Sequence, residues 1–337
     1  PAVSAAGAVL IRADTGAILF EKDAEKRLYP ASTTKIMTAL VVLEILEELS
    51  LGADSRVIVP AEAAGLEGSS IYLKAGEKVM MEELLYGMML QSGNDAATAA
   101  AICAGGNLRN FVARMNRKAE ELGCTGTHFT NPTGLHSDNT YTTARDMAIM
   151  AKYAMQKSAF SSIVKNYAVQ LGQTNKHADL WQYSTNKMLL TSSPYYYAPV
   201  VGIKTGSTDA AGQCLVSSAV RGSRTLISVV LGAEKVEKEN GSGYIVESFT
   251  ETARLFDWGF DNFSSRQVLD ENELVQEVPV ALSKQVSTVA VHPAQSAEAM
   301  LPKDLDVESL TRTVTLDNET ALAPIAAGDR LGEITVS

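Results

Sequence analysis

The chain has 337 residues, a formal net charge of −10 at pH 7 and a hydrophobic content of 46%. That length is sufficient for two domains with a sizeable core. The acidic balance, without any long basic stretch, argues against a nucleic-acid partner. No uninterrupted run of about 18 apolar residues is present, so the sequence predicts no membrane-spanning segment.

The elements predicted for residues 1–261 are one antiparallel sheet and a block of helices. A β-hairpin is expected at residues 6–12 and 17–22. Helices are expected at residues 32–49, 81–90, 95–104, 108–122 and 244–260, and three more strands at residues 200–206, 213–220 and 224–231. Together they predict an α+β domain in which helices cover an antiparallel sheet.

The composition changes near residue 262. Short strand-like runs follow at residues 277–282, 288–291, 312–316 and 331–336, and their alternation and spacing predict a small antiparallel β-sandwich. We therefore expect two domains, residues 1–261 and residues 262–337. The second carries no cluster of reactive side chains, so it is expected either to position the first against a surface or partner, or to be purely structural.

The first motif that carries chemistry is Ser32-Thr33-Thr34-Lys35, at the start of a strongly helical stretch. Residues at i and i+3 share one face of a helix, so the Ser32 hydroxyl and the Lys35 amine can meet. A lysine whose pKa is lowered by burial and by nearby cations can take the proton of a serine and make it nucleophilic. The positive end of the helix beside Ser32 favours negative charge there.

The second motif, Ser92-Gly93-Asn94, lies between two predicted helices. Gly93 is expected to supply the permissive backbone for a tight turn, which would direct Ser92 and Asn94 outward from a rigid base. Ser92 can relay a proton between a lysine and a leaving group. Asn94 can hydrogen-bond both a lysine and a substrate amide.

The third motif, Lys204-Thr205-Gly206, is followed by Ser207 in a β-branched strand. Gly206 would let a substrate backbone lie close to the strand edge, so an extended peptide could bind as an added strand. Lys204 and the hydroxyls of Thr205 and Ser207 suit a terminal carboxylate. The backbone N–H groups of Ser32 and Ser207 are candidates for an oxyanion hole.

Taken singly, each motif also fits a simpler interpretation: an exposed lysine near a helix start, a polar turn, and a plain strand end. All three in this order, each in a fitting context, are hard to obtain by chance. Together they describe one site for attack by a serine on an amide. The set is shared, with an aspartate in the middle of the second motif, by class A β-lactamases and penicillin-binding proteins.

With these residues, the chain resembles the low-molecular-mass penicillin-binding proteins, specifically the serine-type D-alanyl-D-alanine carboxypeptidases. The resemblance covers residues 5–261 and, more loosely, the rest. It is carried by segments 29–39, 90–97, 131–135, 202–208 and 256–260. It implies the penicillin-binding and β-lactamase-like fold for the first domain.

The resemblance also implies an activity. A serine D,D-carboxypeptidase removes the terminal D-alanine from peptidoglycan pentapeptides that end in D-Ala-D-Ala, through an acyl-enzyme on Ser32. Lys35 would be the base, and Ser92 with Asn94 would handle proton transfer and amide positioning. β-Lactams would acylate Ser32 as inhibitors of slow turnover.

Two positions depart from the family pattern. Members often carry an arginine shortly before the final helix, which assists the substrate's terminal carboxylate. Residues 234–247 contain no arginine, and Ser248 stands near the matching position. Carboxylate recognition is therefore expected to depend on Lys204, Thr205 and Ser207. Ser207 itself stands where some relatives have histidine.

Two rival functions fit the same motifs. A β-lactamase of this fold would need a deacylating carboxylate, which in class A enzymes is a glutamate between the second and third motifs. Residues 131–204 contain no glutamate, and their only acids are Asp138, Asp146 and Asp179. A catalytically silent wall-binding or sporulation scaffold would keep the motifs only as relics. The four residues expected to carry the chemistry are all intact here: Ser32, Lys35, Ser92 and Asn94.

Neither a metal nor an organic cofactor is implied, because the four histidines are scattered without metal-ligand spacing. His136, next to segment 131–135, is expected to be a solvated loop residue. The chain starts at Pro1 without a signal peptide. For an exported family member this predicts a mature or trimmed form in the cell envelope, at the outer face of the cytoplasmic membrane. Any terminal anchor would be missing, with peripheral membrane contact made through a segment not present here.

The three cysteines leave two arrangements open. Cys103 and Cys124 lie at the ends of consecutive predicted helices that could bring them together, and an exported setting would let a disulfide persist. Two unlinked, mostly buried thiols are the favoured alternative. Cys214 is expected to be a buried free thiol in a strand, too far from Ser32 to serve as the nucleophile.

Overall fold

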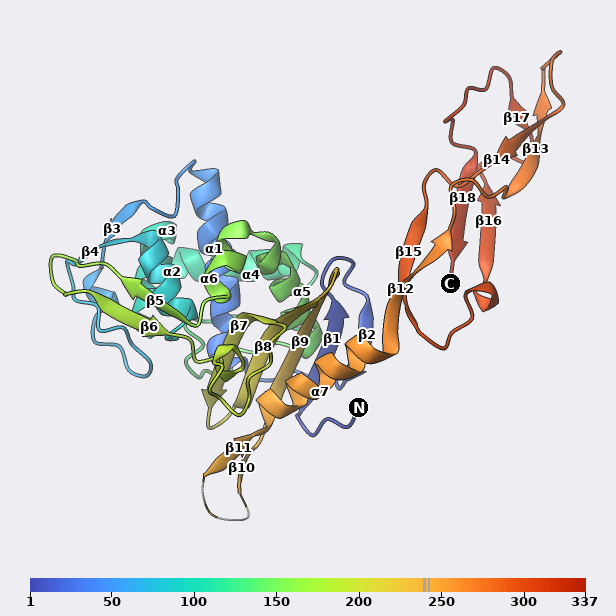
Figure 1. Ribbon diagram of the computed structural model, residues 1–337. Helices are drawn as coiled ribbons and strands as arrows, with labels where there is room; N and C mark the ends of the chain where they lie inside the picture. The colour runs from blue at the N-terminus through green and yellow to red at the C-terminus, as the bar shows by residue number, and fades with distance from the viewer. Residues whose placement is uncertain (239–240, 242) are drawn as a thin grey trace. The chain divides into compact units, whose positions relative to one another are not determined.

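The N-terminal hairpin and three strands from residues 200–233 form one five-stranded antiparallel sheet in the order β2-β1-β9-β8-β7 (Figure 1). Its strands are β1 (Gly7–Arg12), β2 (Ile18–Lys22), β7 (Val200–Thr208), β8 (Gly212–Arg221) and β9 (Arg224–Ala233). The first strand therefore lies inside the sheet, and β7 lies at an edge. The computed structural model describes residues 1–238, 241 and 243–337.

Helices cover both faces of this sheet, as the sequence predicted. The helices are α1 (Lys35–Glu48), α2 (Met81–Met89), α3 (Asn94–Gly105), α4 (Leu108–Glu121), α5 (Ala144–Gln156), α6 (Ser158–Val164) and α7 (Glu247–Asn262). Short 3₁₀ turns lie at η1 (Ala31–Thr34), η2 (Ala61–Ala63), η3 (Lys187–Leu189) and η4 (Val307–Ser309). The predicted helix at residues 32–49 thus begins as a 3₁₀ turn, and α5 and α6 were not predicted.

The two faces of the sheet follow from the period of two in β1. Val9 and Ile11 belong to the core beneath the helical block. Leu10, which points the other way, lies against α7, where a Cβ on Gly259 would come within 2.6 Å of its side chain. Alternate residues of a strand face opposite sides, so a strand buried on both sides needs a continuous apolar run.

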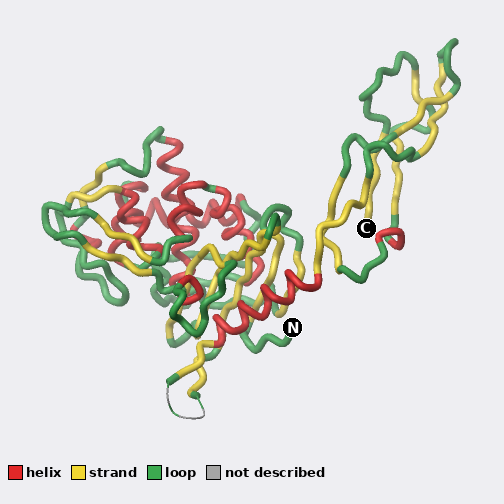
Figure 2. The backbone as a smooth tube through the Cα atoms, in the orientation of Figure 1, coloured by secondary structure: helices red, strands yellow, loops and turns green. Residues whose placement is uncertain are grey.

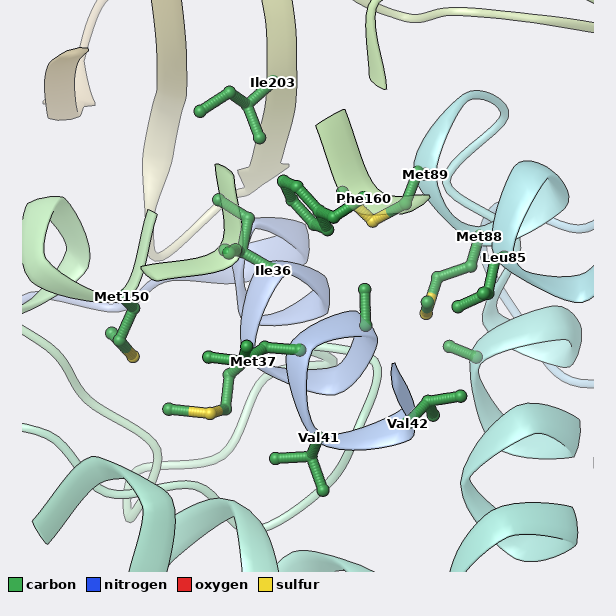
Figure 3. Close-up of a cluster of buried hydrophobic side chains, with 14 of the residues drawn as sticks. Ile36, Met37, Val41, Val42, Leu85, Met88, Met89, Met150, Phe160 and Ile203 are labelled. Atoms are coloured by element: carbon green, nitrogen blue, oxygen red, sulfur yellow. The ribbon is translucent and has the colours of Figure 1, made fainter. Parts of the chain in front are cut away.

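Helix α1 runs through the middle of the helical block (Figure 3). Its apolar side chains lie on all sides of the helix, which is typical of a fully buried helix. Around it Figure 3 shows Leu85, Met88 and Met89 of α2, Met150 of α5 and Phe160 of α6. Lys35, the first residue of α1, is also fully buried. The core therefore places one amine in an apolar setting.

Three two-stranded ribbons complete the first 246 residues: β3 (Arg56–Ile58) with β4 (Lys78–Met80), β5 (Ala168–Leu171) with β6 (Leu180–Tyr183), and β10 (Lys235–Glu237) with β11 (Tyr244–Val246). The last of these corrects the predicted start of the final helix at residue 244. Tyr244, Ile245 and Val246 pair with β10 instead, because aromatic and β-branched residues favour a strand.

The chain divides into two units, Pro1–Gly259 and Phe260–Ser337. After the end of α7, the second unit consists of strands and loops with one short helical turn (Figure 2). Its strands are β12 (Phe263–Leu269), β13 (Gln276–Ala281), β14 (Thr288–Val291), β15 (Ala297–Pro302), β16 (Arg312–Leu316), β17 (Ala321–Leu322) and β18 (Gly332–Val336).

The predicted sandwich was expected to be wholly antiparallel, and one pair differs. Residues Val280 and Ala281 of β13 pair in parallel with Ala321 and Leu322 of β17. A parallel pair needs a long connection between its strands, and here about forty residues separate them. The strands β12, β15 and β17 were not predicted. Among the described residues, no helix has the length and apolar character needed to cross a bilayer.

All three cysteines are free thiols, so the favoured alternative of two unlinked thiols is the arrangement found. The Cys103 Sγ lies 3.6 Å from the carbonyl oxygen of Ile58, and the Cys124 Sγ lies 3.6 Å from that of Asp146. Cys214 is buried in β8, as expected, and burial raises the pKa of its thiol to about 11. It is therefore protonated at neutral pH.

Leu85→Ala should lower the free energy of unfolding by about 2–5 kcal/mol, because its side chain is fully buried against α1 and leaves a cavity. Leu49→Ala is the matched control, since Leu49 is 59% exposed and its loss should cost less than about 0.5 kcal/mol. Urea unfolding followed by tryptophan fluorescence measures both, because Trp181 and Trp258 lie in the first unit. Equal effects of the two substitutions would contradict the packing described.

Candidate active site

Ser32 lies in η1, directly before α1, and η1 lies against strand β7. In a 3₁₀ turn the side chains at i and i+3 eclipse each other, and the Nζ of Lys35 lies 3.0 Å from the Ser32 Oγ. A Cβ on Gly206 of β7 would come within 2.9 Å of the Ser32 backbone nitrogen and 3.0 Å of that of Thr33. Gly206 was predicted to admit a substrate backbone. In the structure, the close approach of η1 is what leaves no room for a side chain at residue 206.

Lys35 is fully buried, and its Nζ has three oxygen neighbours. Besides the Ser32 Oγ, these are the Asn94 Oδ1 at 2.8 Å and the Thr133 carbonyl oxygen at 2.6 Å. Burial, followed by the charge of Lys204, lowers the pKa of Lys35 well below its usual 10.5, and Asp95 opposes this shift. The two fixed acceptors occupy two N–H groups. The remaining tetrahedral position faces Ser32, where a neutral amine can accept the serine proton.

The carbonyl of Thr133 was missed by the sequence analysis, although its segment was noted. The Asn131 Oδ1 accepts hydrogen bonds from the backbone nitrogens of Thr133 and Gly134 and from the Thr133 hydroxyl. Gly134 has φ +80°, and a Cβ there would overlap the carbonyl oxygen of Ala31. The sequence did offer a signal for this turn. Asn131 can bond to the backbone two and three residues further on, and Gly134 can take the left-handed conformation.

The turn of the second motif is made differently from the prediction. Ser92 has the positive φ, +65°, whereas Gly93 has φ −57°. Gly93 is needed for its small size, because a Cβ would come within 2.8 Å of the Asp95 carboxylate and 3.3 Å of Ile71. A left-handed serine is strained, and such strain persists where the surroundings enforce it.

The two polar residues of this motif are both buried. The Asn94 Oδ1 accepts from Lys35, as predicted, while its Nδ2 donates to the Glu67 carbonyl oxygen at 2.8 Å. The Ser92 hydroxyl forms no hydrogen bond within the described part of the chain. It is therefore available to an incoming group.

Asp95 is a second residue that the sequence analysis did not assign. Its buried carboxylate accepts hydrogen bonds from the backbone nitrogens of Ile71 and Leu73 and from the Ser70 hydroxyl. These bonds fix the loop before β4 against the start of α3. Preceded by Gly93-Asn94 and followed by an alanine-rich helix, Asp95 was identifiable as an acid in a first turn.

The residues of the third motif alternate between two faces of β7. Lys204 and Gly206 are buried, whereas Thr205 is half-buried and Ser207 is exposed. The Lys204 Nζ donates to the Thr205 carbonyl oxygen at 2.9 Å, and burial lowers the pKa of Lys204 to about 7. The Thr205 Oγ1 lies 2.5 Å from that of Thr185. The expected carboxylate cluster is thus divided, with Lys204 on the opposite face from the two hydroxyls.

The position near which relatives often have an arginine is occupied by Ser248, which is buried in α7. Part of segment 234–247, namely residues 239, 240 and 242, lies outside the described residues. The side chain of His136 is 43% exposed, beside Asp138 and the ring of Tyr29. Across the described ranges, no group of three His, Cys, Asp or Glu side chains is arranged to hold a metal ion.

Comparison with known families gives the assignment. A family model described as D-alanyl-D-alanine carboxypeptidase, of peptidase family S11, matches residues 1–235. The chain belongs to this family. The D-alanyl-D-alanine carboxypeptidase DacF of Bacillus subtilis is 33% identical over 332 residues, covering 98% of this chain and 81% of the relative. DacC of Escherichia coli is 32% identical over 342 residues, covering 99% and 80%.

Solved structures of the family share the fold. Penicillin binding protein 5 from Haemophilus influenzae superposes with a TM-score of 0.81 at 29% identity, over 100% of this chain and 93% of that one. A single-site mutant of the Streptomyces K15 DD-transpeptidase gives a TM-score of 0.67 at 33% identity, over 77% of this chain and 99% of that one. The predicted α+β class is therefore confirmed.

Lys204→Met should stabilise the fold below pH 7. There the folded and unfolded states both hold the proton, and the folded state bears the cost of a buried charge. The difference between a pKa of 10.5 and one of about 7 corresponds to roughly 5 kcal/mol, less about 1 kcal/mol for the lost hydrogen bond. Between pH 7 and 10.5 only the unfolded state holds the proton, so the gain shrinks with rising pH and vanishes above 10.5.

Urea unfolding at pH 6, 8 and 10 tests this expectation, with the exposed Lys187→Met as control. A gain that does not change with pH would show that charge burial is not its cause. The same variant should lose catalytic activity, because the charge of Lys204 helps to lower the pKa of Lys35.

Proposed function

We propose that the protein is a serine D,D-carboxypeptidase that removes the terminal D-alanine from peptidoglycan stem peptides ending in D-Ala-D-Ala. The observation that carries this proposal is the environment of Lys35: a buried amine, with two fixed acceptors, whose third position faces the Ser32 Oγ at 3.0 Å. Family membership and the names of the relatives supply the reaction and the substrate. A peptidoglycan substrate sets the reaction outside the cytoplasm.

In the first step, neutral Lys35 takes the proton of Ser32 as the serine oxygen attacks the carbonyl carbon of the penultimate D-alanine. The oxyanion that forms is stabilised by the backbone N–H groups of Ser32 and Ser207. The approach of Gly206 to the Ser32 nitrogen supports this assignment, since it brings η1 and the edge of β7 together. Burial and the charge of Lys204 lower the pKa of Lys35, which favours the neutral amine that can act as a base.

In the second step, the bond between the carbonyl carbon and the leaving nitrogen breaks. The proton held by Lys35 passes to that nitrogen, with Ser92 as the relay, and free D-alanine departs. Water then hydrolyses the ester on Ser32 with the same groups acting in reverse. Asn94 holds Lys35 through its Oδ1 and positions the substrate amide with the donor capacity that its Nδ2 retains.

The substrate binds as an added strand along the free edge of β7. Its terminal carboxylate lies near the hydroxyls of Thr205 and Ser207, without a family-type arginine, and Lys204 contributes its positive charge from the other face of the strand. β-Lactams, which mimic the D-Ala-D-Ala end, acylate Ser32. Residues 1–261 carry the chemistry, and residues 262–337 position this domain, with peripheral contact to the membrane.

A β-lactamase activity is not favoured, since residues 131–204 contain no glutamate and each of their three aspartates has another setting. The Asp146 carboxylate accepts hydrogen bonds from Gly126 and Thr127, and Asp179 accepts one from Gln170. Asp138 is 90% exposed beside His136. A silent scaffold is not favoured either, because the Lys35 contacts that catalysis needs are all formed.

Ser32→Ala should abolish release of D-alanine from an acylated D-Ala-D-Ala tripeptide, because it removes the attacking oxygen. It should also abolish the covalent benzylpenicillin adduct that mass spectrometry detects on the unaltered chain. Ser192→Ala, at an exposed position, is the control. Absence of an adduct on the unaltered chain at saturating drug would refute the proposal, and faster turnover of a chromogenic cephalosporin than of the tripeptide would favour a β-lactamase.

Ser92→Ala should lower kcat for D-alanine release by roughly 10²- to 10⁴-fold, the usual contribution of a proton-transfer group. Because Ser92 forms no hydrogen bond in the described part of the chain, its removal should leave the urea unfolding midpoint nearly unchanged. Steady-state kinetics and unfolding of the same preparation measure both quantities. Loss of activity together with a large loss of stability would instead indicate a structural role.

A further inference from the structure

A large groove opens at the end of β7 beyond the catalytic serine. It has a volume of about 770 Å³, and its lining includes residues 27–29 and the β7–β8 turn. A smaller hollow beside Ala31 and Gly134 shares two lining residues with it, Tyr29 and Thr208. The groove therefore adjoins the hollow next to Ser32.

The direction of the proposed substrate leads into this groove. If the terminal carboxylate lies near Lys204 and Thr205, and the attacked carbonyl lies opposite Gly206, the rest of the peptide must run toward Ser207 and Thr208. An extended chain advances about 3.3 Å per residue. The residue that precedes D-Ala-D-Ala thus lies at the rim formed by Thr208, with its side chain within reach of the groove.

The groove carries charges of both signs. Its cations are Arg27 and Lys235, and its acids are Asp138, Asp209 and Glu234. The Arg27 guanidinium lies over the ring of Tyr141, 4.5 Å from the ring centre. In the described part of the chain, Arg27 has no carboxylate partner, so its N–H fork remains available.

From this arrangement we infer that the groove is a subsite for the side chain before D-Ala-D-Ala, and that it selects a side chain ending in both an ammonium and a carboxylate. The inference rests on the proposed function. The carboxylate pairs with Arg27, whose planar fork suits that geometry. The ammonium lies near Asp209, one of the three acids that line the groove. A side chain with an amine alone leaves Arg27 unpaired.

Three acylated peptides of the form X-D-Ala-D-Ala test the subsite, with X as 2,6-diaminopimelate, lysine or alanine. The first side chain ends in amine and carboxylate, the second in amine alone, and the third in a methyl group. The unaltered chain should release D-alanine from the diaminopimelate peptide with a kcat/KM roughly tenfold above that for the lysine peptide, the size of one charge-assisted hydrogen bond at an open site.

Arg27→Gln should remove this tenfold preference by lowering kcat/KM for the diaminopimelate peptide, relative to the alanine peptide. Asp209→Asn should instead lower kcat/KM for both amine-bearing peptides relative to alanine. Arg109→Gln is the matched control, because Arg109 is an exposed arginine of α4 outside the groove. It should leave all ratios unchanged.

The outcomes separate the two proposals. If D-alanine is released from all three peptides at equal kcat/KM, or if Arg27→Gln leaves the ratios intact, the subsite is refuted and the carboxypeptidase assignment stands. A preference for the lysine peptide also refutes it. If the unaltered chain releases D-alanine from none of the peptides and forms no benzylpenicillin adduct, the proposed function itself fails, and the subsite with it.

Discussion

The burial of one lysine amine organises the rest of the site. An uncompensated ammonium in a protein interior is costly, and the chain holds Lys35 there by directing three oxygens at it from three distant parts of the sequence. Each oxygen comes from a segment with its own constraint: a 3₁₀ turn for Ser32, a strained turn for Asn94 and an asparagine-folded turn for Thr133. Displacing any one of them would alter the protonation of the amine as well as its position.

The second buried lysine acts on the first through charge. Lys204 lies on the face of β7 that is directed toward η1, and its charge is among the causes that lower the pKa of Lys35. Two amines close together in an apolar interior disfavour each other's proton. The edge strand thus contributes to the electrostatics of the base, in addition to the substrate binding proposed for it. The third motif combines a lysine that carries this charge with a glycine that admits η1.

The sequence was sufficient to identify the residues that converge but not the geometry that joins them. The pairing of Ser32 with Lys35 followed from a local spacing of three, which is valid in both an α-helix and a 3₁₀ turn. The roles of Thr133 and Asp95 depend on contacts across 98 and 22–25 residues, which no local pattern contains. At Ser92 and Gly93 the rule that glycine takes positive φ failed, because tertiary crowding by Asp95 and Ile71 decided which residue had to be small.

The position of β1 inside the sheet has a consequence for how the chain acquires its structure. β1 forms a local hairpin with β2, but Gly7 also pairs with Leu231, and Arg12 with Leu226. The strand therefore finds this second partner only after more than 200 further residues have been made. Closing so long a loop is entropically costly, and folds rich in such pairings form slowly. During synthesis from the N-terminus, the chain therefore lacks its central sheet until about the last third of its residues is being made. Until then, the first two thirds of the chain lack the sheet that holds β7 against η1.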